Sequence, residues 1–186
     1  MKTLRALRAL FLLAVAVALG ACSTLSPRTM TFSEADIARM LEQHSPFQRR
    51  LMEVLDVRVL HPTVRLLAGS NRLASTFDVS ATERVSRTTL GGRIAIEYGL
   101  RYDDAEKAIR ITQVRVNSLE LDNVSPEKRA GIRNLGSLIG ENMLDDAVLY
   151  RFKPSDLKNA EGRGYKPGSV TVTSRGVEVT LAPLDH

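Results

Sequence analysis

The sequence predicts an α+β domain in which a long, strongly curved antiparallel sheet wraps around a long helix in the C-terminal half, with a short helix at the N-terminal end. Three observations predict it. Apolar and polar residues alternate over long segments between 55 and 121, which is typical of strands with one buried face. A strong helix start follows at 125, and a second alternating region follows after 170.

The first 21 residues carry the features of an export signal with a lipid-attachment site. Three basic side chains precede an apolar run at 9–19, which is too short to span a bilayer, since that takes about 20 apolar residues. The run leads into Leu19-Gly20-Ala21-Cys22, a segment that resembles the lipobox of bacterial lipoproteins. The alternative is an ordinary secreted protein whose cysteine is incidental.

The lipobox resemblance implies a processed chain that is anchored to a membrane without spanning it. It implies cleavage before Cys22, a diacylglycerol on that cysteine and acylation of the new amine, for example by palmitate. Two or more acyl chains anchor a protein stably, whereas one chain does so only marginally. Ser23 comes next, which in Gram-negative lipoproteins resembles the default for sorting to the periplasmic face of the outer membrane. We expect residues 1–21 to be a lipoprotein signal peptide, 22–31 a lipidated tether and 32–186 a single α+β domain.

The composition excludes several classes of partner. Residues 1–21 hold three of the 26 basic residues and none of the 21 acidic ones, which leaves a side-chain net charge of +2 for 22–186. The basic residues are scattered and form no concentrated face, so a nucleic-acid partner is not expected. Cys22 is the only cysteine, so no disulfide is expected, and the absence of Trp argues against an aromatic platform for sugars.

A short helix is predicted at the start of the domain. Ser33 is a suitable N-cap, acidic residues occupy the first turn, and Ile37 and Leu41 recur at helical spacing. Ser45 precedes Pro46, and the residue before a proline leaves the helical region of backbone space. We therefore expect the helix to end there.

Alternation with a period of two then replaces the helical pattern. Apolar residues alternate with polar or small ones over 55–59, 73–79 and 94–102. Ser75 interrupts the apolar side of the second segment. Between 109 and 121 the parity of the apolar positions changes twice, which predicts one long strand with β-bulges near Gln113 and Ser118. Bulges bend a strand, so these segments favour a curved sheet.

A long helix is predicted from the Ser125-Pro126-Glu127 start to about Tyr150. A helix of about 25 residues is roughly 37 Å long, a span that matches long strands. Its glycines lower the helix propensity by about 1 kcal/mol each relative to Ala, so close approach of another backbone is expected. The segment 153–168 is predicted to be a loop with at most a short helix, followed by a hairpin over 170–181.

No catalytic constellation is found in the sequence. His44, His61 and His186 lack metal-ligand spacing, and no nucleophile elbow, zinc-protease or phosphate-loop motif occurs. The Gly-rich segment 162–168 lacks the spacing of a nucleotide-binding loop and is interpreted as a flexible connection. We therefore expect no enzyme, no cofactor and no metal, although an active site assembled from distant residues stays open.

The order of these features resembles the YceB-like bacterial lipoproteins. The resemblance rests on the lipobox, the Phe32–Ile37 segment, the strand segment Ala108–Val114, the Ser-Pro-Glu helix start and Val148-Leu149-Tyr150 at the expected helix end. That family resembles the tubular lipid-binding (TULIP) architecture, in which a curved sheet surrounds a long helix. The resemblance implies binding of a lipid or another apolar ligand and implies no reaction. The tail after Lys153 departs from the family because it is longer and more hairpin-like.

The candidate ligand lining combines apolar character with strand or helix periodicity. It comprises Leu55, Val57, Phe77, Val79, Ile96, Tyr98, Ile109, Ile111, Leu138 and Met143. An ordinary packed core needs the same residue types, so two functions remain open. One is a membrane-anchored envelope lipoprotein that binds a lipid between sheet and helix. The alternative is an envelope protein-interaction or assembly factor with a filled core and no ligand, whose protein partner the sequence does not identify.

Overall fold

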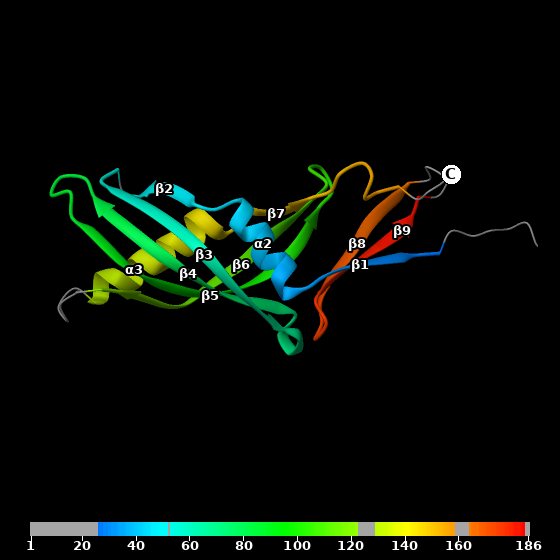
Figure 1. Cartoon of the computed structure of the whole chain (residues 1–186), viewed down its shortest axis with the longest axis horizontal. Coiled ribbons are helices and arrows are strands. Elements are labelled where there is room, and N and C mark those ends of the chain that lie inside the picture. The colour runs from blue at the N-terminus through cyan, green and yellow to red at the C-terminus, as the bar shows by residue number, and fades with distance from the viewer. Residues whose placement is uncertain (1–25, 52, 123–128, 159–163, 185–186) are drawn as a thin grey trace, which may run out of the picture.

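A computed structural model describes residues 26–51, 53–122, 129–158 and 164–184. The expected signal peptide, the expected lipid-attachment site Cys22 and the predicted helix start Ser125-Pro126-Glu127 lie outside the described residues. The molecule is elongated, with a curled six-stranded sheet at one end and a three-stranded sheet at the other (Figure 1).

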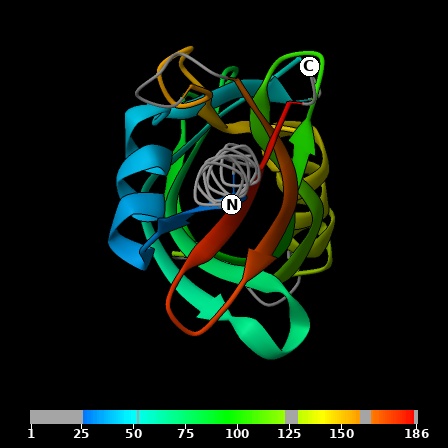
Figure 2. The ribbon, with the colours of Figure 1, turned by 90° about the vertical axis from the view of Figure 1, so that its right-hand side faces the viewer.

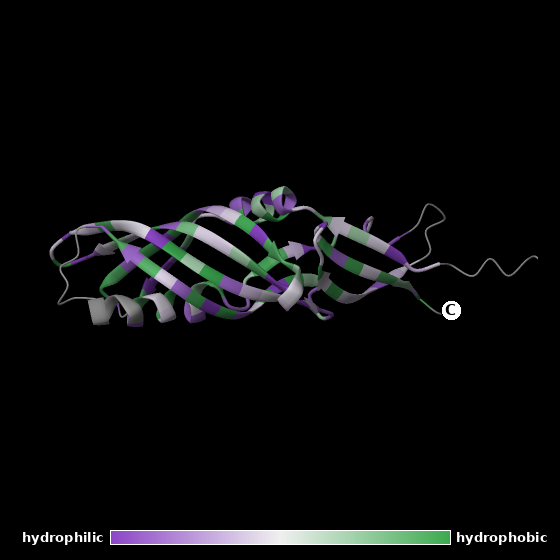
Figure 3. Ribbon diagram, turned by 90° about the horizontal axis from the view of Figure 1, so that it is seen from below, coloured by the Kyte–Doolittle hydropathy of each residue, from purple (hydrophilic) through white to green (hydrophobic). Residues whose placement is uncertain are grey.

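The six-stranded sheet is antiparallel, and its strands follow one another in sequence order. They are β2 (Phe47–Leu51), β3 (Leu55–Leu67), β4 (Arg72–Glu83), β5 (Thr89–Asp103), β6 (Ala108–Leu121) and β7 (Val148–Arg151). Viewed along the long axis, the sheet curves round as a half-barrel, with the two helices on opposite sides (Figure 2). Hydrophobic and hydrophilic bands alternate along its strands, as the period of two in the sequence predicts (Figure 3).

Shifts of strand register provide the curvature. The pairing of β3 with β4 shifts between Leu60 and Thr63, and that of β5 with β6 shifts twice along its length. These two shifts leave extra residues on β6 around Gln113 and next to Ser118, which confirms both predicted bulges. Each bulge bends its strand and raises the local twist, so the long strands curl and do not form a flat sheet.

The short N-terminal helix is confirmed as α2 (Glu34–Gln43), with Ser33 as its N-cap. The Ser33 hydroxyl accepts a hydrogen bond from the Asp36 amide at 3.2 Å, and the Asp36 carboxylate accepts one from the Ser33 amide at 3.0 Å. This capping box satisfies amides that a helix start leaves unpaired. Glu34 also accepts a hydrogen bond from the Leu66 amide at 2.8 Å, which ties α2 to β3.

The prediction of a long C-terminal-half helix is wrong, and with it the α+β fold class, because the described fold is mainly β. The α-helix α3 spans Arg129–Ile139, one π-helical turn follows at Gly140–Leu144, and the chain is extended at Asp145. Residues 148–150, expected to end the helix, form β7 and pair with β6. Their β-branched and aromatic side chains favour a strand. Two hydrogen bonds join the chain to β6 directly after the helix. The Asp146 amide donates to the Ile111 carbonyl, and the Ile111 amide donates to the Ala147 carbonyl.

Close packing against β6 is the reason for two of the helix glycines. A Cβ atom at Gly140 would lie 2.8 Å from Val116 Cγ2, and one at Gly136 would lie 3.3 Å from Val116 Cγ1. Val116 pairs with Ile96, whose side chain is buried. Thus α3 covers the buried face of the sheet along β6, and the sheet does not wrap around it.

The three-stranded sheet has the order β1 (Arg28–Phe32), β9 (Val177–Pro183), β8 (Tyr165–Val172). The predicted C-terminal hairpin is confirmed by the pairing of β8 with β9. The prediction that 153–168 is loop is wrong at its end, since β8 begins at Tyr165. β1 pairs with β9 over the last residues of the segment expected to be a tether.

Candidate ligand-binding site

The ten residues predicted to line a cavity all belong to one hydrophobic core. Exposures of 0–3% are found for Val57, Phe77, Val79, Ile96, Tyr98, Ile109 and Ile111. A side chain beside a void that admits water would show accessible surface on that void. The half-barrel is therefore filled around these seven residues, in line with the close packing of protein interiors. Leu55, Leu138 and Met143 are half-buried against the same core. The role of all ten residues as ligand contacts stays a prediction.

The interior also accommodates two polar side chains as a pair. Ser75 interrupts the apolar pattern of β4, and its hydroxyl lies 2.9 Å from the hydroxyl of Tyr98 on the neighbouring strand. Both side chains are buried, and burial raises the pKa of the Tyr98 phenol well above its usual range. Each hydroxyl of this pair satisfies the other, as buried polar groups generally require. Arg72 is also buried, and its Nε forms no hydrogen bond among the described residues.

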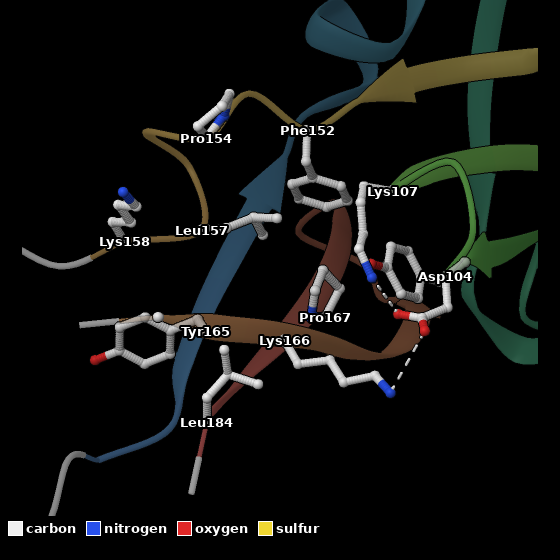
Figure 4. A pocket seen from close by; sticks show the side chains of 12 residues that line it. Asp104, Lys107, Phe152, Pro154, Leu157, Lys158, Tyr165, Lys166, Pro167 and Leu184 are labelled. Atoms are coloured by element: carbon white, nitrogen blue, oxygen red, sulfur yellow. Dashed lines mark hydrogen bonds and ion pairs between the residues drawn. The ribbon is translucent and has the colours of Figure 1, made fainter. Parts of the chain in front are cut away.

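A pocket of about 580 Å³ lies where the two sheets meet, and we call it the seam pocket. It is formed by the β5–β6 turn, the segment after β7, the first residues of β8 and the end of β9 (Figure 4). Seven of its side chains are apolar or aromatic, four are charged, and one lining residue is glycine. These are Tyr102, Phe152, Pro154, Leu157, Tyr165, Pro167 and Leu184, then Asp104, Lys107, Lys158 and Lys166, then Gly164.

Aromatic packing and backbone hydrogen bonds set the wall of the seam pocket. Phe152 packs edge-on against Tyr102, with ring centroids 5.9 Å apart, and against Tyr150 at 5.1 Å. The Phe152 amide donates to the Lys107 carbonyl at 2.9 Å, which ties the segment after β7 to the β5–β6 turn. The Tyr165 amide donates to the Leu157 carbonyl at 2.8 Å and fixes the opposite side.

A hydrogen-bonded turn holds the segment after β7 over the pocket. The carboxylate of Asp156 accepts a hydrogen bond from the Tyr150 hydroxyl at 2.6 Å and from the Lys153 amide at 2.8 Å. Burial, together with the neighbouring Asp156 carboxylate, raises the pKa of Tyr150 to about 12. The tyrosine is therefore a neutral hydrogen-bond donor at physiological pH, and the turn stays closed.

Charged side chains gather at one end of the seam pocket. Asp104 accepts a hydrogen bond from Lys107 at 2.8 Å and lies 3.7 Å from Lys166 Nζ (Figure 4). The hydrogen bond from Lys107 lowers the pKa of Asp104, so the carboxylate is ionised at neutral pH. Beside them, the Tyr102 hydroxyl is buried and has no hydrogen-bond partner among the described residues. Burial raises the pKa of this phenol, which keeps its proton available for donation.

Two further pockets are smaller and more polar. One of about 350 Å³ lies between α2 and β7 and is lined by residues such as Arg39 and Lys153. The other, of about 340 Å³, lies between β2 and the π-helical turn and includes Met143 from the predicted lining. None of the other nine predicted lining residues borders any of these three pockets.

Sequence reasoning missed the seam pocket because its residues lie in turns and irregular segments, where no periodicity marks them. A compositional signal was present. The chain has 20 arginines and six lysines, and three of those lysines border this one pocket. The segment interpreted as a flexible connection, 162–168, contributes Gly164, Tyr165, Lys166 and Pro167 to the lining.

Neither a metal-ligand cluster nor a membrane-spanning helix is found among the described residues. Within the described ranges, no three His, Cys, Asp or Glu side chains gather closely enough to hold a metal ion. No helix in the described part of the chain is both long and apolar enough to cross a membrane. The expectation that the chain is not an enzyme stays a prediction.

Comparison with known proteins gives little similarity. No family model and no curated protein matches the sequence. A solved structure described as "Crystal structure of lipopolysaccharide binding protein" is similar over 84% of this chain and 40% of that chain, with 11% sequence identity and a TM-score of 0.29. This chain thus spans less than half the length of that one. Membership of the YceB-like family stays a prediction.

Proposed function

We propose that this protein is a binding module for an amphipathic, lipid-like molecule and that the seam pocket is its site. The observation that carries the proposal is a pocket of about 580 Å³ with seven apolar or aromatic side chains on its wall. Small-molecule sites have volumes of about 300–1,000 Å³ and combine mostly apolar walls with a few polar groups. The seam pocket has both properties, whereas the filled half-barrel has neither around its seven most buried predicted contacts.

We also propose that the chain is an envelope lipoprotein, anchored to the outer membrane through lipid on Cys22. The sequence of the lipobox supports this proposal. β1 begins at Arg28, six residues after Cys22, and six extended residues span at most about 20 Å. The Arg28 guanidinium stacks on the ring of Tyr165, at 5.4 Å from its centroid, and Tyr165 lines the seam pocket. An anchor on Cys22 would thus hold the pocket close to a lipid surface.

The anchoring proposal is tested by metabolic labelling. Cells that express the full chain are fed labelled palmitate, and the protein is expected to take up the label and to move to its processed size. The Cys22→Ser variant is expected to stay unprocessed and unlabelled. Wild-type protein that never takes up palmitate would overturn this part of the proposal and leave an ordinary secreted chain.

The binding proposal is tested by filling the pocket. Leu184 is 48% exposed and lines the pocket, and Val85 is 85% exposed in the β4–β5 turn, outside the pocket lining. Uptake of a neutral fluorescent probe, N-phenyl-1-naphthylamine, is measured for the processed chain and for Leu184→Trp and Val85→Trp. We expect Leu184→Trp to lose most of the uptake and Val85→Trp to keep it, with unchanged melting temperatures. Equal uptake by both variants would exclude the seam pocket.

The filled half-barrel supports a second candidate, a protein-interaction or assembly factor without a ligand. Seven of the ten predicted contacts have exposures of 0–3%, as a solid domain requires. The same experiment separates the two candidates, because wild-type protein that takes up no probe favours the interaction factor. Crosslinking in intact cells would then identify its partner.

A further inference from the structure

The lysines of this chain are concentrated at the seam pocket. Three of the six lysines border it, and no arginine of the described part of the chain does. Lys107 and Lys166 lie at one end with Asp104, and Lys158 lies at the other (Figure 4). With one acidic and three basic side chains, the pocket carries a formal charge of +2. Such a surplus next to an apolar wall attracts a ligand with a negatively charged group.

The Asp104 end of the pocket leaves one positive charge uncompensated. The carboxylate is shared by two ammonium groups, Lys107 at 2.8 Å and Lys166 at 3.7 Å. Lys107 donates a hydrogen bond to the carboxylate, whereas Lys166 is held only by the longer ion pair, so Lys166 is the ammonium group with the weaker protein partner. Both lysine side chains are about half exposed, and their long apolar stems can cover the pocket wall while the charged ends reach a ligand.

A buried donor without a protein acceptor lies at the same end. The Tyr102 hydroxyl is buried and forms no hydrogen bond of normal geometry among the described residues, although the Asp104 carboxylate lies near enough to contribute to its raised pKa. A buried polar group that stays unpaired costs free energy, on the order of 1–3 kcal/mol. An oxygen atom of an anionic group placed beside the two lysines would accept this hydrogen bond and remove that cost.

We propose that the seam pocket selects amphiphiles with an anionic head group, a carboxylate or a phosphate, which binds beside Lys107 and Lys166. This inference rests on the proposed function, since the apolar wall is taken to hold the chain of the same ligand. Tyr102 donates to the head group, and Asp104 competes with it for the lysines. Because Asp104 competes with the head group, its removal should increase the affinity for the ligand. A variant that merely damages the protein would lower the affinity.

The test compares two ligands with the same twelve-carbon chain, dodecanoate and dodecanol, at pH 8 and low salt. We expect dodecanoate to bind the processed chain more tightly, and we expect added salt to reduce the difference. The Lys166→Met variant should lower the affinity for dodecanoate about two- to fivefold, the range for a half-exposed ion pair, and leave the affinity for dodecanol unchanged. The matched control is Lys153→Met, which removes the same charge outside the seam pocket.

The decisive variant is Asp104→Asn, which should raise the affinity for dodecanoate about two- to fivefold and leave the affinity for dodecanol unchanged. Equal affinities for both ligands, with no response to either pocket variant, would overturn head-group selection and leave the proposed binding of an apolar chain standing. Inorganic phosphate serves as the chain-free probe. Binding of phosphate without either twelve-carbon ligand, or binding of none of the three, would overturn both this inference and the proposed function.

Discussion

The interior of the half-barrel and the seam pocket are built from the same kinds of apolar residue, yet one is filled and the other is open. In the interior, long strands present their side chains at a period of two, and α3 approaches closely enough at Gly140 to close the remaining space. At the seam, two sheets meet through turns and irregular segments whose side chains cannot interdigitate in the same regular way. Regular elements thus give stability here, and their junction leaves a pocket open.

The largest expected contrast comes from truncating one side chain in each region. Phe77 is 1% exposed in the interior, so Phe77→Ala should lower the free energy of unfolding by about 3–5 kcal/mol. Leu184 is 48% exposed at the seam, so Leu184→Ala should change it by no more than about 0.5 kcal/mol while weakening probe uptake. Urea unfolding and probe titration measure both quantities. A similar loss of stability for both variants would show that the seam is part of the core.

Larger side chains at one position in each region test the same contrast in the opposite direction. Because the interior is filled, Ile96→Trp should overpack it and cost about 1–3 kcal/mol. Leu184→Trp should leave the midpoint of unfolding unchanged, since the new ring has the pocket to occupy. If Ile96→Trp were as stable as wild type, the half-barrel would hold a cavity after all, and the prediction that its residues contact a ligand would be supported.

Two buried tyrosine hydroxyls give a smaller and more specific contrast. Tyr98 pairs with Ser75 in the interior, so Tyr98→Phe leaves the serine hydroxyl unpaired and should cost about 1–3 kcal/mol. Tyr102 has no partner among the described residues, so Tyr102→Phe should be neutral or slightly stabilising without ligand. With dodecanoate present, Tyr102→Phe should weaken binding. Thermal melts with and without the ligand measure both effects, and a clear destabilisation of the free Tyr102→Phe variant would reveal a protein partner.

The sequence predicted the regular parts of this fold better than their junctions. The capping box at Ser33 and the two parity changes in β6 are local signals, and both are confirmed. The prediction of a long helix is wrong because a helix start is a local signal, whereas the end of this helix is determined by tertiary hydrogen bonds. Here the exit is set by pairing of residues 146–151 with β6, a partner more than thirty positions earlier in the chain.

The candidate site was less predictable than the fold for a related reason. Periodicity identified ten residues that share one core, yet it could not tell whether that core encloses a cavity. That depends on how closely α3 approaches β6. Gly140 permits the close approach, but the spacing of apolar residues along the helix does not reveal it. The seam pocket draws on segments 102–107, 152–158, 164–167 and 184, and only the meeting of two sheets brings them together.

The smallest expected effect is a dependence of the seam on acid. The hydrogen bond from Lys107 lowers the pKa of Asp104 in the folded chain, so the ionised carboxylate stabilises the fold above its unfolded pKa of about 4. That contribution is lost as the pH falls through the lower folded value. Wild type should therefore melt slightly above Asp104→Asn at pH 6, and the two should converge once the pH has fallen below the lowered folded pKa.

Ligand binding should show the opposite order at the same pH 6, because Asp104→Asn releases the two lysines for an anionic head group. Melting temperatures of the two chains, measured from pH 2.5 to 7 with and without dodecanoate, test both signs together. The matched control is Asp36→Asn, since the pKa of Asp36 is also lowered, chiefly by its hydrogen bond from Ser33, at a site outside the seam pocket. A ligand-dependent gain in the Asp36 variant would show that general charge, and not the seam lysines, determines the affinity.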